Sequence, residues 1–191
     1  NEVAQRFETG HRIRLAVSTS YWPIVWPAPE RVTLSVHLAG SRLVLPERPP
    51  RDEDASLPSF EPAETAAPLV ARELRAPQSR WTIDRDLATG VLHNRIHADD
   101  GEMRLEEIDW KVGSSFHREL SIHPDDPLSA RFHVEGERRF GRGDLNLRIT
   151  TAVKMHATPT TFEIKGRLEA FENEKSVHKR DWQRSIKRDL V

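Results

Sequence analysis

The sequence predicts an all-β protein built from antiparallel strands. Apolar residues alternate with polar ones over many short segments, which is the period of a half-buried strand. In the second half of the chain, turn sequences separate these segments at hairpin spacing. The only helical structure expected is a single turn near residues 63–74.

Two segments near the beginning of the chain have this strand periodicity. Ile13, Leu15 and Val17 alternate with polar or small residues over 13–17, and four apolar residues do the same over 32–38. Each segment therefore predicts a strand with one apolar face.

Between these two segments, residues 18–29 combine three prolines with large aromatic side chains. Prolines at this density exclude a central strand, because each lacks a backbone N–H group. The aromatic residues Tyr21, Trp22 and Trp26 exclude a solvated loop. We expect an irregular segment whose aromatics fill a local core, contact another domain or form a ligand-binding platform.

The composition divides the chain into three parts. Residues 1–46 carry the first predicted strands and form the β-sandwich portion. Residues 47–78 are rich in proline and predict a linker or strap, because proline cannot donate a backbone hydrogen bond. Residues 79–191 predict an antiparallel meander that packs with the first part as one unit.

Three hairpins define the predicted meander. Their paired segments are 81–86 with 91–97, 131–140 with 145–155, and 161–171 with 175–183. The sequence Asp99-Asp100-Gly101 predicts a further turn, because Asp-Gly suits the positive φ of tight hairpins.

The charge balance and composition exclude several classes of partner and site. The 191 residues contain 29 basic and 30 acidic residues, a net charge of −1, and form no basic field that would neutralise nucleic-acid phosphates. No apolar run reaches the roughly 18 residues that span a bilayer. The absence of cysteine excludes disulfides, thiolate catalysis and cysteine-type zinc sites. We expect no nucleic-acid or membrane partner, and the compartment stays open with the cytoplasm favoured.

No catalytic, cofactor-binding or metal-binding residue is predicted. The chain lacks the G-x-S-x-G elbow of α/β-hydrolases and the H-E-x-x-H motif of zinc proteases. His93 and His97 fall in a predicted strand, where residues four apart are separated by roughly 13 Å and do not share an ion. Arg142-Gly143-Asp144 spells the integrin tripeptide, but its composition is ordinary for a hairpin turn.

Several stretches of the chain carry a resemblance to a known family. They are Gly-His-Arg-Ile-Arg-Leu at 10–15, Ser-Thr-Ser-Tyr-Trp-Pro at 18–23, Trp-Pro-Ala-Pro-Glu at 26–30, and residues 41–46, 121–130, 168–171 and 186–190. In this order they resemble the C-terminal domain of the CocE/NonD hydrolases, the superfamily of cocaine esterase and X-Pro dipeptidyl-peptidase. The likeness extends over nearly the whole chain.

The resemblance implies a multi-domain serine hydrolase of which this chain is a non-catalytic part. In the family, an α/β-hydrolase domain carries a Ser-Asp-His triad, a helical cap covers it, and a jelly-roll-like β domain packs alongside. The substrates are esters, amides and X-Pro dipeptides. Because the chain begins without Met and further strands precede Gly10 in the family, we expect a fragment. It would form an incomplete, galactose-binding-like sandwich, or a sheet whose exposed edge recruits a second copy.

The implied partner is the catalytic domain of the parent chain. Tyr21, Trp22 and Trp26 are the candidate interdomain or pocket-wall contacts, and no cofactor is implied. A homo-oligomer through an exposed sheet edge is a further expectation. The alternative function is an independent β module that binds carbohydrate or protein, which predicts an exposed aromatic face including Trp22 or Trp26.

Overall fold

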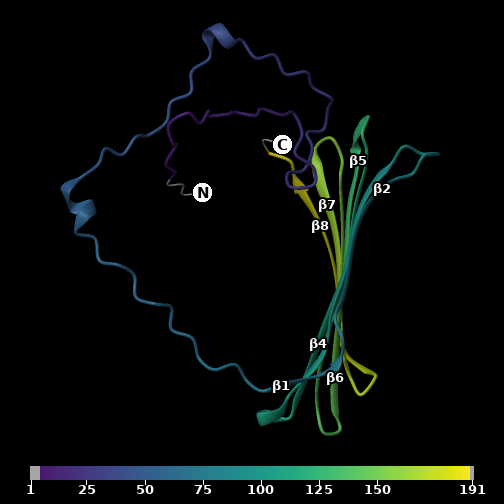
Figure 1. The fold of residues 1–191 in the computed structure, drawn as a ribbon. Helices are drawn as coiled ribbons and strands as arrows, with labels where there is room; N and C mark the ends of the chain where they lie inside the picture. Colours follow the sequence, from purple (N-terminus) through teal and green to yellow (C-terminus); the bar gives the residue numbers. More distant parts are fainter. Residues whose placement is uncertain (1–4, 190–191) are drawn as a thin grey trace.

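The computed structural model describes residues 5–189 (Figure 1). These residues form eight β-strands and three short 3-10 helices. The strands are β1 (Ala71–Arg75), β2 (Gln78–Arg85), β3 (Leu92–Leu105), β4 (Trp110–His123), β5 (Asp126–Arg142), β6 (Leu145–Ala157), β7 (Thr161–Glu172) and β8 (Lys175–Lys187); the helices are η1 (Leu38–Gly40), η2 (Asp52–Ala55) and η3 (Glu106–Ile108). No helix in the described residues is long and apolar enough to cross a membrane.

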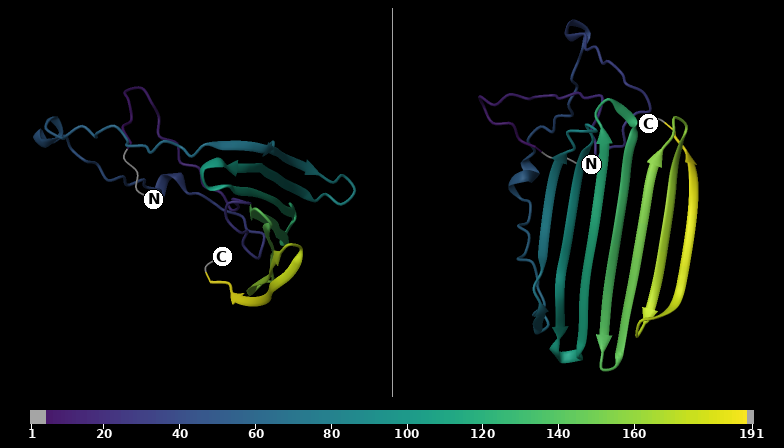
Figure 2. Two further views of the ribbon diagram at one scale, coloured as in Figure 1. Left: turned by 90° about the horizontal axis from the view of Figure 1, so that it is seen from below. Right: turned by 90° about the vertical axis from the view of Figure 1, so that its right-hand side faces the viewer.

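All eight strands belong to one open antiparallel sheet. From β3 to β8 each strand pairs with the next one along the chain, whereas β1 and β2 both pair with β3. The right-hand view of Figure 2 shows the long strands side by side, with β8 at one edge and β1 and β2 at the other. The predicted all-β class and antiparallel meander are therefore confirmed, and the sheet does not close on itself.

The three predicted hairpins are confirmed as β2–β3, β5–β6 and β7–β8. Arg142-Gly143-Asp144 lies at the tip of the β5–β6 hairpin. Asn173 and Glu174 connect β7 to β8 with φ values of 46° and 66°. Two successive positive φ values are typical of the tight turn whose twist matches that of paired strands.

The turn predicted at Asp99-Asp100-Gly101 is wrong, because β3 continues through it. The chain bulges there instead, and Gly101 has a φ of +78°. Asp-Gly supplies the positive φ that a bulge requires as readily as the one that a turn requires. The reversal from β3 to β4 occurs later, at η3 and Asp109.

The bulge lies opposite a break in the edge of the sheet. β1 pairs with the end of β3 and β2 with its beginning, so that the two short strands lie end to end. Pro77, which cannot donate a ladder hydrogen bond, lies at the break. A Cβ on Gly101 would come within 2.2 Å of the Arg75 carbonyl oxygen, so glycine is required for the two backbones to approach.

The register gives the sheet one apolar and one charged face. One row across the sheet is Trp81, Ile96, Arg118, Val134, Val153, Gly166 and Trp182. Because side chains alternate along a strand, the neighbouring row lies on the opposite face. That row is Arg80, His97, His117, Glu135, Ala152, Arg167 and Asp181. We call the surface that carries the first row, with Trp81 and Trp182, the apolar face. The surface that carries the second row, with Arg80 and Asp181, is the polar face.

Among the described residues before β1, none is in a strand, so the strands predicted at 13–17 and 32–38 are wrong for this structure. Their apolar side chains are exposed, for example 68% for Leu15 and 50% for Leu34. A strand is stable when a neighbour satisfies its backbone N–H and C=O groups, and no described segment pairs with these two.

The helical turn predicted near 63–74 is also wrong, because this stretch is irregular until β1 begins at Ala71. β1 and the first residue of β2 lie inside the segment 47–78 that was predicted as a linker. The division of the chain into parts 1–46, 47–78 and 79–191 stays a prediction. Figure 1 shows the chain before β1 as a wide loop on one side of the sheet.

Candidate functional site

The aromatic segment around Trp22 contacts one end of the sheet. Backbone N–H groups of Ile24 and Val25 both donate to the Tyr21 carbonyl oxygen, which folds the segment into a compact turn. This turn brings the rings of Trp22 and Trp26 together edge to face, with centroids 5.0 Å apart. Such edge-to-face pairs are favoured by the charge distribution of aromatic rings.

Trp26 carries the contact onward to the sheet. Its ring meets that of Phe162, the second residue of β7, edge to face at 6.0 Å. Trp22 and Trp26 are half-buried, whereas Tyr21 is 66% exposed. Two of the three predicted site residues therefore contact each other, and one of them also contacts the sheet.

Arg188, directly after β8, fixes the segment against the sheet. Its guanidinium donates hydrogen bonds to the Pro27 carbonyl oxygen at 2.6 Å and to the Thr158 carbonyl oxygen at 3.1 Å. It also stacks over the Phe162 ring at 4.9 Å. Arg188 is 8% exposed, and burial lowers the pKa of its guanidinium from the usual value.

A second contact lies at the neighbouring β4–β5 turn. Arg31 forms an ion pair with Asp125 at 3.4 Å. A shallow hollow of about 240 Å³ lies between the two parts and is lined by Thr19, Ser20, Pro27, Ala28, Glu30, Arg31, Val32, Pro124 and Pro127. The aromatic segment and the residues after it thus bridge two turns at the same end of the sheet.

Sequence reasoning missed the sheet side of this contact. Phe162 fell in the predicted strand segment 161–171 and Arg188 in the stretch 186–190 that carried the family resemblance, but neither was predicted to contact the aromatic segment. Arg188 and Pro27 are 161 residues apart. Hydrophobic periodicity is a local signal and does not report such a pairing.

The polar face carries a chain of ion pairs. Arg95 bonds Asp84 at 2.6 Å and Glu119 at 3.0 Å, and His93 Nδ1 lies 2.8 Å from the same Glu119 oxygen. Burial alone would raise the pKa of Glu119, but the hydrogen bond from His93 and the charge of Arg95 hold it below the usual value. Across the described residues, no group of three histidine or acidic side chains is placed to hold a metal ion.

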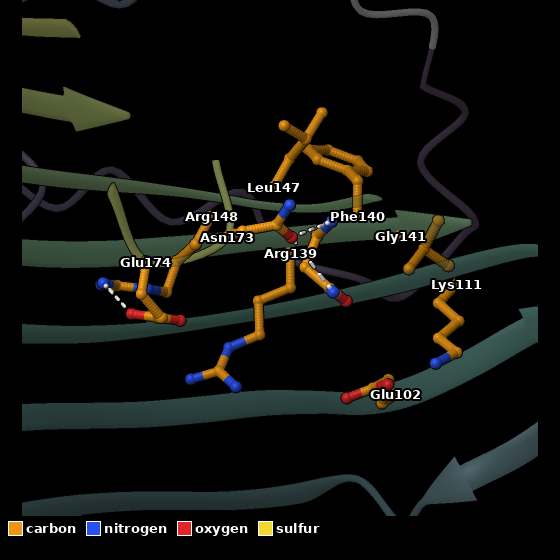
Figure 3. A pocket seen from close by; sticks show the side chains of 11 residues that line it. Glu102, Lys111, Arg139, Phe140, Gly141, Leu147, Arg148, Asn173 and Glu174 are labelled. Carbon is orange, nitrogen blue, oxygen red and sulfur yellow. Dashed lines mark hydrogen bonds and ion pairs between the residues drawn. The ribbon is translucent and has the colours of Figure 1, made fainter. Parts of the chain in front are cut away.

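A hollow on the polar face lies at the other end of the sheet (Figure 3). It measures about 400 Å³, smaller than the shallower hollow of about 630 Å³ between Glu135 and Asp181, and its walls carry both charges: Glu102, Lys111, Arg139, Arg148 and Glu174. Arg148 donates to Glu174 at 2.9 Å and covers the Phe171 ring at 3.9 Å. These contacts satisfy the cation, so this part of the hollow stabilises the β7–β8 turn.

The comparison with known proteins gives a match in the part of the chain that holds the aromatic residues. Residues 1–67 match the family model of the X-Pro dipeptidyl-peptidase C-terminal non-catalytic domain. The first third of the chain is similar to that domain. This match confirms the resemblance for the stretches within residues 1–67, whereas those at 121–130, 168–171 and 186–190 lie outside it. It supports an accessory rather than a catalytic part of a peptidase-like hydrolase. No curated protein and no solved structure matches the chain.

The aromatic segment lies within the matched residues and also makes the contact with the sheet. The matched residues 1–67 end before β1, so they include Trp22, Trp26 and Pro27 but none of the eight strands. The sheet contributes Phe162 and Arg188 to the same contact.

Proposed function

We propose that this chain is the C-terminal accessory domain of an α/β-hydrolase-type serine hydrolase and has no activity alone. The observation that carries the proposal is the match of residues 1–67 to a non-catalytic domain of X-Pro dipeptidyl-peptidases. The parent enzyme would cleave esters, amides or X-Pro dipeptides, with its catalytic serine outside this chain.

The role of the domain would be to support a neighbouring domain by packing. Clusters of exposed apolar side chains are typical of surfaces that contact another layer of protein. Trp81, Ile83 and Phe116 of the apolar face are 68%, 71% and 41% exposed. Tyr21, at 66% exposure, is the predicted contact residue most available to a catalytic domain. The accessory domain would fix the geometry of the catalytic domain and form one wall of the catalytic pocket.

The proposal is tested first on the purified chain. X-Pro p-nitroanilides and p-nitrophenyl esters should show no turnover above a buffer control. Turnover that persists through further purification and is abolished by a serine-directed inhibitor would overturn the proposal. The inhibitor separates an intrinsic serine nucleophile from non-enzymatic ester hydrolysis.

The second test is the DNA upstream of the Asn1 codon. The proposal predicts an open reading frame that encodes a G-x-S-x-G segment between a strand and a helix, which is the nucleophile elbow of α/β-hydrolases. A stop codon directly upstream, or an upstream domain without a nucleophile elbow, contradicts it.

A carbohydrate- or protein-binding module is the second candidate, supported by the exposure of Tyr21. Its expected platform is weakened by geometry, because Trp22 and Trp26 meet at 87° and do not present one flat surface. Titration with oligosaccharides, followed by tryptophan fluorescence, distinguishes the two functions. Saturable quenching that Tyr21→Ala removes would favour the binding module.

A further inference from the structure

The polar face brings two histidine rings together from neighbouring strands. His97 of β3 and His117 of β4 are directly opposite each other in the antiparallel pairing. Their ring centroids are 6.4 Å apart, and the ring planes are inclined by 44°. From the sequence, His97 was considered only with His93 on its own strand, where the separation is too large for a shared ion. The register of the sheet gives His97 a different partner, at a much shorter distance.

The ring nitrogens of this pair are not used within the fold. Neither His97 nor His117 makes a hydrogen bond or an ion pair with another described residue. Other histidines of the sheet are engaged: His93 Nδ1 lies 2.8 Å from Glu119, and His123 Nδ1 accepts the backbone N–H of Asp125 at 3.1 Å. A neutral imidazole keeps one ring nitrogen as an acceptor. Each ring of the pair therefore has a lone pair available to an external ligand.

The separation of the two rings fits a shared metal ion. Bonds from a metal to a histidine nitrogen are about 2.0–2.1 Å long, which puts the ion roughly 3.2 Å from the centre of each ring. Two imidazoles on one ion therefore have centroids roughly 4.5–6.4 Å apart, for angles at the metal from about 90° to about 180°. The observed 6.4 Å lies at the upper end of this range. A small rotation of either side chain brings the rings to the shorter separations.

The two rings line a hollow that also contains carboxylates. The hollow measures about 380 Å³, and its charged and histidine wall residues are His97, His117, Glu135, Glu137 and Arg167. Glu135 is the residue opposite His117 on β5, so it is the next member of the same row. Arg167, the cation of the hollow, is already paired with Asp181 at 2.7 Å. Arg80, on the other side of His97, is not among the residues that line the hollow. The charge next to the pair on the side of the hollow is therefore favourable to a cation.

We propose that His97 and His117 bind one divalent transition-metal ion as its two protein ligands. Imidazole nitrogens suit zinc, nickel and copper(II), whereas calcium and magnesium prefer oxygen ligands. Structural zinc sites use four protein ligands. A pair of histidines therefore gives an exchangeable site, whose further positions are open to water or to a small ligand in the hollow. The proposal agrees with the finding that no three histidine or acidic side chains of the described residues are grouped around an ion.

The proposed metal site goes beyond the accessory function and does not depend on it. The two histidines lie in β3 and β4, outside residues 1–67 that carry the family match. They are also apart from the aromatic segment, which contacts β7 and the end of β8. Failure of either proposal would therefore leave the other unchanged.

The first test is titration of the purified chain with copper(II), followed by electron paramagnetic resonance. We expect the tightest site to hold one copper ion per chain, with a spectrum that shows coupling to imidazole nitrogen. His97→Asn and His117→Asn should each weaken this binding at least about tenfold, because even an outer-shell partner of a metal is worth about tenfold in affinity. His156→Asn is the matched control, since His156 lies on the same face in β6 but has no second histidine opposite it. It should leave the affinity unchanged.

The second test measures thermal stability in the presence of zinc ions. A metal that joins β3 to β4 binds the folded chain more tightly than the unfolded chain, and so raises the Tm. The rise should occur in the original chain and in His156→Asn, and should be absent in both variants of the pair. Circular dichroism without metal checks that each variant is folded. Because the two histidines are changed separately, a variant that fails to fold leaves the other as the test.

Three results would overturn the proposed site. The first is the absence of saturable copper binding by the original chain. The second is copper affinity and zinc stabilisation that stay the same in both His97→Asn and His117→Asn. The third is a loss of affinity that follows His156→Asn as strongly as the variants of the pair, because the metal would then be bound by scattered histidines.

Discussion

Arg188 donates a hydrogen bond of 2.6 Å to the carbonyl oxygen of Pro27, and so joins the end of β8 to the aromatic segment. Because the arginine is 8% exposed, its charge is largely removed from water. The same guanidinium bonds Thr158 and covers Phe162. One side chain therefore connects the segment that carries the family match to the sheet that follows it.

Arg188→Ala should release the aromatic segment. Hydrogen bonds to charged groups contribute about 1.5–3 kcal/mol each, and the substitution leaves the Pro27 carbonyl without this donor. We expect the free energy of unfolding to fall by about 1–3 kcal/mol, with faster amide exchange over residues 21–31. Arg184→Ala, whose guanidinium bonds only the neighbouring Gln183 carbonyl among the described residues, is the control. Equal effects of the two variants would contradict the role of Arg188.

The Trp26–Phe162 contact should appear as a coupling energy. In a double-mutant cycle of Trp26→Ala and Phe162→Ala, the two rings should show about 0.5–1.5 kcal/mol of interaction, the range for edge-to-face pairs. Urea denaturation followed by circular dichroism gives the four unfolding free energies. The control cycle of Tyr21→Ala and Phe162→Ala should give a coupling energy near zero, because Tyr21 is exposed. Coupling as large in the control cycle would show that the effect is not local.

The hairpins were predictable because their signals are local. In the β7–β8 hairpin, Asn173 and Glu174 form the turn. The alternation of apolar and polar residues on either side of them defines the two strands. The Asp99–Gly101 sequence was misread because a bulge and a turn require the same positive φ. The choice between them depends on Arg75, at the end of β1, and Pro77, between β1 and β2, and these distant residues give no signal at Gly101 itself.

The segment 13–17 shows the limit of reasoning from periodicity. Its alternation of Ile13, Leu15 and Val17 specifies which residues share a face, but a strand also needs a partner for its backbone. The site has the same limit. Trp22 and Trp26 were found from composition, whereas Phe162 and Arg188 could be recognised as their neighbours only from the folded chain.

Gly101→Ala should destabilise the broken edge of the sheet. The new Cβ would meet the Arg75 carbonyl oxygen at 2.2 Å while the backbone keeps a φ of +78°. We expect a loss of about 2–3 kcal/mol in the free energy of unfolding. Gly143→Ala is the matched control, because its φ is +53° and no atom lies within 4 Å of its Cβ position. Its loss should be about 1 kcal/mol, from the backbone conformation alone. A Gly101→Ala variant no less stable than the control would mean that the two backbones separate freely.

Glu119→Gln should reduce the acid sensitivity of the fold. His93 and Arg95 hold the pKa of Glu119 below its usual value of 4.5 in the folded chain. A carboxyl group with a lowered folded pKa binds fewer protons when folded than when unfolded. Its stabilising effect is therefore complete above about pH 4.5 and is lost as the pH falls through the folded pKa. We expect Glu119→Gln to be less stable than the original chain at neutral pH and to lose less stability below pH 4.5. Urea denaturation across this pH range measures the difference, and Glu107→Gln, an exposed position in η3, should leave the profile unchanged. Parallel profiles for Glu119→Gln and the original chain would show that the His93–Glu119–Arg95 contacts do not persist in solution.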